Sequence, residues 1–200
     1  MTASGADEPL VRNGWSIFAH SQFLNSLESL VAEVERLRAK DPKRYTAKNS
    51  TKRLAAIIKL AFEIIPQDPA RPEYRQGATL GDEYRHWFRA KFFQQYRLFF
   101  RYHLDSRIII LAWVNDEETK RAYESGTDAY RIFRRMLKNE NPPDDWNELL
   151  REAKAHTKRM RAANQGKLFA DRPAALTAGG LLDATQKFKG KGAGSRRKRR

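Results

Sequence analysis

Three consecutive runs of the sequence read WFRAKFF (87–93), YRLFFRYH (96–103) and RIIILAWV (107–114). They are rich in aromatic and β-branched residues, which favour extended strands, and only short links separate them. We therefore expect an antiparallel meander of three strands. The third run is apolar at successive positions, which is typical of a central strand covered on both faces.

Two apolar stripes at helical spacing precede these strands. One covers residues 21–39 with Ser21 as a candidate N-cap, and the other runs through residues 54–65 and stops at Pro66. Such three- and four-residue spacing indicates amphipathic helices. The chain is thus expected to open with a hairpin of two helices that pack on one face of the sheet. Residues 66–86, which hold prolines and glycines between scattered charges, are predicted to form a long loop.

Further helices are predicted beyond the sheet, capped by Asn115-Asp116, by Thr127 and by Asp144. The last of them gives way after Ala155 to a basic stretch without apolar periodicity. The expected organisation is a flexible N-terminus (1–12), one folded α+β domain (13–155) and a basic, largely disordered tail (156–200).

The net charge of +15 is concentrated near the C-terminus, because residues 157–200 alone contribute +11 of it. A basic tail on a modestly basic domain suggests a polyanionic partner such as nucleic acid, although a merely solvated tail has the same composition. The chain has no cysteine, so disulfides and thiolate chemistry are excluded. No apolar run approaches the length of a membrane span, so a cytoplasmic protein without a membrane partner is expected.

Basic residues alternate along the first two predicted strands. Strand alternation places Arg89 and Lys91 on one face of the first strand, and Arg97, Arg101 and His103 on one face of the second. If the two faces coincide, these residues form one exposed basic surface that could grip RNA phosphates. The alternative is that they only keep an exposed strand face soluble.

The coincidence of the two faces depends on the link between the strands. A two-residue turn at Gln94-Gln95 would pair Phe92 with Arg97 and separate the basic sets, whereas an odd-length loop or a bulge would bring them together. The sequence alone leaves both possibilities open. If the surface is exposed, Trp87 is a candidate for stacking on unpaired bases.

Several stretches of the sequence resemble one known family of proteins. They are NGWSIFAH (13–20), LVAEVERLRAKDP (30–42), YRLFFRY (96–102), IIILAWVNDEETKRAY (108–123), TDAYRIFRRML (127–137) and NPPDDW (141–146). In order and without large gaps they closely resemble YhaV-type toxins of the RelE superfamily of ribonuclease toxins. The resemblance covers about residues 11–152 and leaves the tail outside it.

The resemblance implies a RelE-like fold, with two N-terminal helices on a small antiparallel sheet and C-terminal helices. It also implies cleavage of messenger RNA and neutralisation by a cognate antitoxin of the PrlF type. In RelE-like enzymes the working face carries a basic pair on one strand, matched by Arg89 and Lys91, and an arginine in a YR-L element on the next, matched by Arg97. The hairpin between them is one residue shorter than in YhaV-type proteins. The later functional positions of the family fall among Arg121, Tyr123 and Tyr130.

A metal-free ribonuclease can use the ribose 2′-OH of its substrate as the nucleophile, so neither a metal nor a cofactor is expected. Arg97, with Arg89 or Arg101, would hold the phosphate, and Lys91 would act as general base. A tyrosine or His103 would protonate the leaving oxygen. The ribosome is a further candidate partner, and operator DNA is expected to be bound only through the toxin–antitoxin complex. The alternative function is that of an inactive relative that binds RNA, the ribosome or operator DNA.

Overall fold

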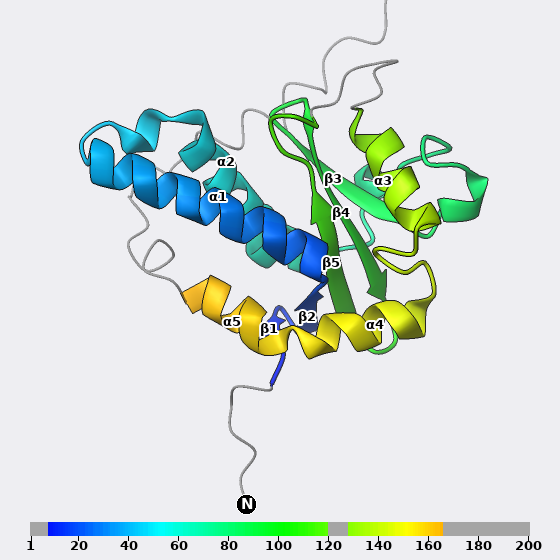
Figure 1. Ribbon diagram of the computed structural model, residues 1–200. Coiled ribbons are helices and arrows are strands. Elements are labelled where there is room, and N and C mark those ends of the chain that lie inside the picture. Colours follow the sequence, from blue (N-terminus) through cyan, green and yellow to red (C-terminus); the bar gives the residue numbers. More distant parts are fainter. Residues whose placement is uncertain (1–7, 120–127, 166–200) are drawn as a thin grey trace, which may run out of the picture.

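The computed structural model describes residues 8–119 and 128–165, and this part of the chain forms a five-stranded sheet with helices on both sides (Figure 1). The strands are β1 (Leu10–Arg12), β2 (Trp15–Ala19), β3 (Phe88–Phe92), β4 (Tyr96–His103) and β5 (Ile108–Val114). Their order in the sheet is β1-β2-β5-β4-β3. The antiparallel meander β3-β4-β5 is therefore confirmed, but β2 pairs with β5 in parallel.

In the described part of the chain a β-hairpin precedes the two helices, so the prediction that the helices come first is wrong. Asn13 and Gly14 form the two-residue turn that pairs Arg12 with Trp15, and their φ angles are 49° and 77°. Positive φ at both positions is the mark of a type I′ hairpin turn, which Asn-Gly forms at little cost. Residues 10–12, which we expected to belong to a flexible N-terminus, form strand β1.

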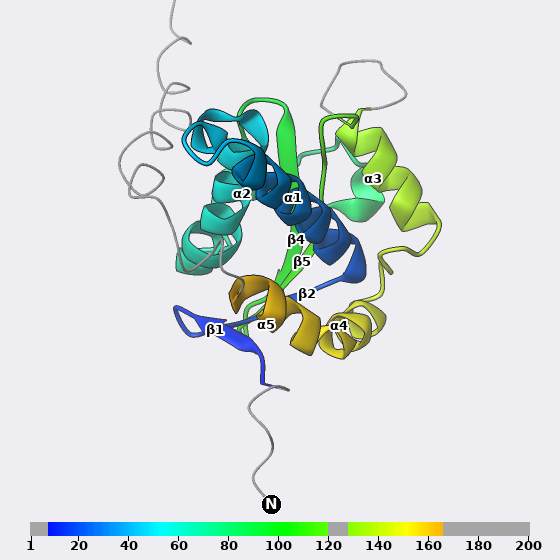
Figure 2. The same ribbon diagram turned by 60° about the vertical axis from the view of Figure 1, so that its left-hand side comes forward.

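The two predicted N-terminal helices follow this hairpin. Helix α1 spans Ser21–Lys40, and its N-cap is His20 rather than Ser21, because the imidazole accepts a hydrogen bond from the Gln22 amide. Helix α2 spans Asn49–Lys59 and continues through a π-helical turn (Leu60–Ile64) and a 3-10 turn (Ile65–Gln67). Both helices lie side by side over one face of the sheet (Figures 1 and 2).

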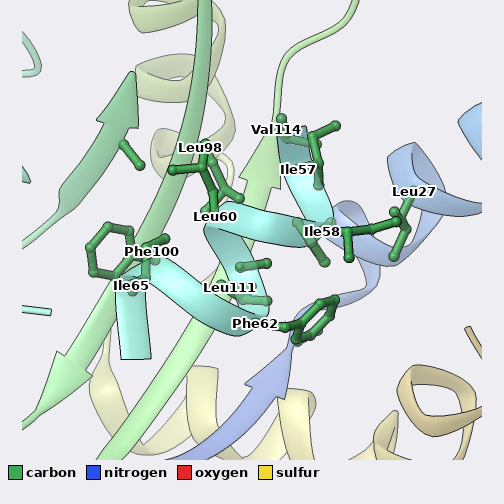
Figure 3. Close-up of a cluster of buried hydrophobic side chains, with 14 of the residues drawn as sticks. Leu27, Ile57, Ile58, Leu60, Phe62, Ile65, Leu98, Phe100, Leu111 and Val114 are labelled. Carbon is green, nitrogen blue, oxygen red and sulfur yellow. The ribbon is translucent and has the colours of Figure 1, made fainter. Parts of the chain in front are cut away.

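The first hydrophobic core lies between these helices and the sheet (Figure 3). Side chains from α1, α2 and the π-helical turn, such as Leu27 and Ile57, pack on Leu98 and Phe100 of β4 and on Leu111 of β5. The loop predicted over 66–86 contains two short 3-10 helices, Pro72–Tyr74 and Asp82–Tyr84. The prediction that the two N-terminal helices pack on one face of the sheet is thus confirmed.

The opposite face of the sheet carries a second core, rich in aromatic rings. Helix α3 spans Ala129–Lys138 and helix α4 spans Trp146–Ala155. Phe133 of α3 stacks on Phe99 of β4 with a centroid distance of 4.1 Å. The N-caps are Asp128 and Asp145, each one residue later than predicted. Arg89 and Arg97 on this face are buried and Lys91 and His103 are exposed, so the prediction of one exposed basic surface is wrong for the two arginines.

The described domain also continues beyond the boundary that we predicted at residue 155. Helix α5 spans Thr157–Gln165, and its Met160 is only 2% exposed in the first core. Arg159 donates hydrogen bonds to Glu28 of α1 at 2.6 and 2.7 Å, which fastens α5 to α1. Residues 166–200 of the predicted tail lie outside the described residues. Among the helices that are described, none combines the length and apolar character needed to cross a bilayer.

Candidate active site

The link between β3 and β4 is an odd-length loop, which is the condition for the two basic strand faces to coincide. Phe92 pairs with Tyr96 across a three-residue loop, so Lys91 lies directly opposite Arg97. The loop is tight, with positive φ at Phe93 and Gln94. An odd-length loop keeps Arg89, Lys91 and Arg97 on the same face of the sheet, as the functional hypothesis required.

Two of these three cations are buried beneath α3. Arg89 is 7% exposed and Arg97 is 5% exposed, whereas Lys91 is exposed to solvent. The Arg89 guanidinium donates to the carbonyl oxygen of Glu73 at 2.6 Å, and Arg97 Nη1 donates to the carbonyl oxygens of Gln94 and Tyr96 at 2.6 and 2.7 Å. The expected exposure of Arg97 is therefore wrong, since the guanidinium lies within the fold and orders the hairpin.

Tyr130 joins the two arginines from the first turn of α3. Its hydroxyl accepts a hydrogen bond from Arg89 Nε at 2.7 Å, and its ring packs edge-on against Phe99. Burial by itself would raise the pKa of Tyr130, but the charges and hydrogen bonds of Arg89 and Arg97 outweigh it and lower that pKa below its ordinary value. A phenol with a lowered pKa is a better proton donor near neutral pH.

Asn115 fixes the start of β4 against the end of β5. Its side-chain oxygen accepts from the backbone N–H of Arg97 at 2.6 Å, and its amide donates to the carbonyl oxygens of Gln95 and Thr119. Asn115 is 1% exposed, so it is a buried positioning residue; residues 115–119 do not form the helix that we expected it to cap, and the rest of that predicted helix lies outside the described residues. Its signal in the sequence is a lone amide directly after an apolar strand. Arg121 and Tyr123 lie outside the described residues.

Arg101 and Trp87 belong to a different cluster on the same face. The Arg101 guanidinium lies over the rings of Trp87 and Trp146, at 5.4 and 5.3 Å from their centroids, and donates to the carbonyl oxygen of Asp144 at 2.5 Å. Along β4 it is four residues, or about 13 Å, from Arg97. Burial lowers the pKa of Arg101 from its ordinary value.

The predicted stacking of Trp87 on RNA bases does not fit its surroundings. Trp87 is 0% exposed, and its indole N–H donates to Asp144 Oδ1 at 2.6 Å. His86 contacts the same carboxylate oxygen at 2.7 Å. Asp144, which we expected to cap a helix, therefore links the residues just before β3 to the segment before α4.

His103 lies at the far end of β4 from the Lys91–Arg97 pair. It is six residues from Arg97, about 20 Å along the strand, and its Nδ1 accepts from the backbone N–H of Ser106. The structure thus brings together Arg89, Lys91, Arg97 and Tyr130, and it places Trp87, Arg101 and His103 elsewhere. Among residues 8–119 and 128–165, no three acidic or histidine side chains gather where they could hold a metal ion.

Comparison with known proteins connects this arrangement with a family. Residues 17–154 match a family described as a toxin with endonuclease activity, of a toxin–antitoxin system. The chain is 47% identical over 148 residues to the ribonuclease toxin YhaV of Escherichia coli K12, which covers 73% of this chain and 96% of that protein. It is 46% identical over 148 residues, with the same coverage, to toxin YhaV of Escherichia coli O6:H1. No solved structure matches the chain. The extent of these matches, which includes every residue of the cluster around Tyr130, shows that the chain belongs to the YhaV family of toxins.

Proposed function

We propose that this chain is an endoribonuclease that cleaves messenger RNA at the hairpin end of β3 and β4, and so inhibits translation and growth. The observation that carries the proposal is the juxtaposition of Lys91 and Arg97 across the hairpin, with Arg89 and Tyr130 on the same face. A surface lysine beside two buried guanidinium groups attracts phosphate, because buried charges are screened less by solvent than exposed ones.

The proposed reaction uses the RNA as its own nucleophile. The 2′-oxygen of the ribose bonds to the adjacent phosphorus while the bond from phosphorus to the 5′-oxygen breaks. Lys91 takes the proton of the 2′-hydroxyl, and Tyr130 gives its proton to the departing 5′-oxygen. Arg89 and Arg97 stabilise the additional negative charge of the pentacoordinate phosphate. The products are a 2′,3′-cyclic phosphate and a 5′-hydroxyl.

Access to this site is limited in the free protein. Lys91 is exposed, whereas Tyr130 is 3% exposed and both arginines are buried. RNA bound at Lys91 must therefore displace neighbouring side chains before its phosphate reaches the guanidinium groups. Catalytic contacts in substrate-free enzymes often tighten only when substrate binds. Arg121 and Tyr123 remain candidates for the same site.

Membership of a toxin family implies an antitoxin as partner, and we propose a PrlF-type protein for that role. An acidic or mixed-charge antitoxin segment over Lys91 would occupy the place of the RNA phosphate and abolish cleavage. We further propose that operator DNA is contacted only through the toxin–antitoxin complex. The ribosome is proposed as the place where messenger RNA is presented to the toxin.

The experiment that tests this function is cleavage of labelled RNA by the purified protein, alone and with ribosomes, in the presence of EDTA. We expect cleavage to persist in chelator, to leave a 2′,3′-cyclic phosphate and to stop when the residue at the cut carries 2′-deoxyribose. Cleavage at a deoxy position, or a requirement for added magnesium, would contradict the mechanism. RNA binding without cleavage would support the inactive relative instead.

A further inference from the structure

Helix α3 carries a row of cations on its solvent side, which we call the basic stripe. Its members follow the three- and four-residue spacing of one helix face: Arg131, Arg134, Arg135 and Lys138. All of them are exposed. Tyr130, Phe133 and Leu137 occupy the opposite side of the helix and are buried against the sheet. Helix α3 is thus divided into an apolar inner side and a basic outer side.

The basic stripe places like charges next to one another along one helix face. Arg131 lies near the N-terminal end of α3, where the helix dipole disfavours positive charge, whereas Arg135 and Lys138 lie in the last turn, where the dipole favours it. Cations three and four positions apart also repel one another. Helix α1, by contrast, mixes glutamates with its arginines and lysines. Cations clustered along one exposed helix face are typical of a surface that binds a polyanion.

One ion pair of the stripe lies at the protein surface. Arg134 contacts Glu83 at 3.3 Å, and the two side chains are 46% and 53% exposed. Exposed ion pairs of this kind contribute little to stability, since water and salt compete for both partners. A phosphate can therefore take the place of Glu83 at small cost.

The stripe begins next to the candidate active site. Tyr130, whose hydroxyl contacts Arg89, immediately precedes Arg131 in the chain. From Arg131 to Lys138 the stripe extends about 10 Å along the helix. Helix α3 lies on the face of the sheet opposite α1 and α2, so the stripe leads away from the active site over a surface that those helices leave uncovered (Figures 1 and 2).

We propose that the basic stripe of α3 binds the phosphodiester backbone of single-stranded RNA next to the scissile bond. Guanidinium groups can grip non-bridging phosphate oxygens with two hydrogen bonds, and the contact is independent of base sequence. This inference rests on the proposed function, because the strand held by α3 is the substrate of the active site. The stripe would then contribute to affinity and orientation, and not to the chemical step.

The test compares two variants of the full chain that lose the same charge. The stripe variant carries Arg131→Gln, Arg134→Gln, Arg135→Gln and Lys138→Gln. The control variant removes four exposed cations near the far end of the α1–α2 hairpin, through Arg36→Gln, Lys40→Gln, Lys43→Gln and Lys48→Gln. The probe is a single-stranded 2′-O-methyl oligonucleotide, which cannot react by 2′-OH attack, and its binding is followed by fluorescence anisotropy over a range of salt concentrations.

The stripe variant is expected to bind the probe at least about tenfold more weakly at low salt, with a salt dependence lower by about two to three in log–log slope. The control variant should change affinity by less than about twofold. On cleavable RNA, the KM of the stripe variant should rise while kcat stays near that of the parent. Its melting temperature should not fall, because removal of like-charge repulsion offsets the loss of the Arg134–Glu83 pair.

Equal affinity of the two variants for the probe would overturn the proposal. So would unchanged RNA binding combined with weaker binding of the cognate antitoxin, since the stripe would then be a protein-binding surface. A failure of the proposed function can be distinguished from a failure of this inference. If the parent binds the probe through the stripe but does not cleave RNA, the stripe is an RNA-binding surface of an inactive protein.

Discussion

The two ends of strand β4 carry arginines on the same side of the sheet but in different surroundings. At the hairpin end, Arg97 lies opposite an exposed lysine and close to a tyrosine whose pKa it helps to lower. Four residues further on, Arg101 is enclosed by Trp87 and Trp146 and donates to a backbone carbonyl. Alternation along a strand therefore determines which side a residue faces, and the helix packed on that side determines what the residue can do.

The difference has a simple physical origin. At the hairpin end, the guanidinium groups of Arg89 and Arg97 converge on one phenol, which concentrates positive charge beside Lys91. At the other end, the charge of Arg101 is spread over two aromatic faces, an arrangement that stabilises a fold. We thus expect substitutions at the hairpin end to affect cleavage, and substitutions at the Arg101 end to affect stability.

The largest effect is expected for Lys91→Ala. Because Lys91 is exposed and is the proposed general base, its loss should lower the cleavage rate by about a hundredfold or more, with little change in melting temperature. Lys43→Ala, which removes another exposed lysine, serves as the control and should cleave like the parent. Cleavage rates on labelled RNA and thermal melting followed by circular dichroism measure both properties. A Lys91→Ala protein with parental activity would remove this residue from the mechanism.

A smaller effect is expected for Tyr130→Phe, which keeps the buried ring but removes the proposed acid. We expect the cleavage rate to fall by about ten- to a hundredfold. A phenol donates its proton only below its pKa, so the parental rate should decline as the pH rises through the lowered pKa of Tyr130. That decline should be absent from the variant. A pH–rate profile at saturating RNA makes the comparison, and identical profiles for the two proteins would assign the acid to another group.

The sequence predicted the secondary structure around this site better than the burial of its side chains. The strands, the separate basic faces of the first and second strands, and the helix after them were visible as patterns in the sequence, but whether the two basic faces coincide depended on the hairpin loop, which the sequence left open. The burial of Arg97 could not be predicted, because periodicity does not show which side of the sheet a later helix covers. The sequence also did not show which of two neighbouring aspartates caps α4, since both Asp144 and Asp145 can cap a helix. In the structure Asp145 is the cap and Asp144 binds the Trp87 indole.

The elements near the two ends of the described chain differ in how well the sequence predicts them. Asn13-Gly14 is a strong hairpin signal, and the β1–β2 hairpin could have been predicted from it. Helix α5 was not predicted, because its sequence TKRMRAANQ has little apolar periodicity and Met160 is buried in a core formed with elements more than a hundred residues earlier, such as α1 and β2. Long-range packing of that kind leaves no local pattern.

The substitution Arg101→Ala should have the opposite effect to Lys91→Ala, with a loss of stability and little change in cleavage. It removes two cation–π contacts and a hydrogen bond to Asp144, so we expect a loss of about 1–3 kcal/mol in the free energy of unfolding. The cleavage rate should stay within about threefold of the parent at temperatures where the variant is folded. Arg101→Lys should recover part of the stability, because an ammonium also binds aromatic faces. Loss of cleavage in a variant of unchanged stability would instead extend the active site along β4.

The smallest effect is expected for His103→Ala, at the end of β4 farthest from the hairpin. His103 is exposed, and its contacts are a local hydrogen bond with Ser106 and a tilted ring contact with Trp146 at 5.6 Å. Substitutions at such positions usually change stability by no more than about 0.5 kcal/mol. Because about 20 Å of strand separates His103 from Arg97, the cleavage rate should change by less than about twofold. A tenfold loss of cleavage on a long RNA but not on a short oligonucleotide would mean that the substrate crosses both ends of β4. The same loss on both substrates would place His103 in the chemical step, contrary to the division of β4 into a reactive end and a structural end.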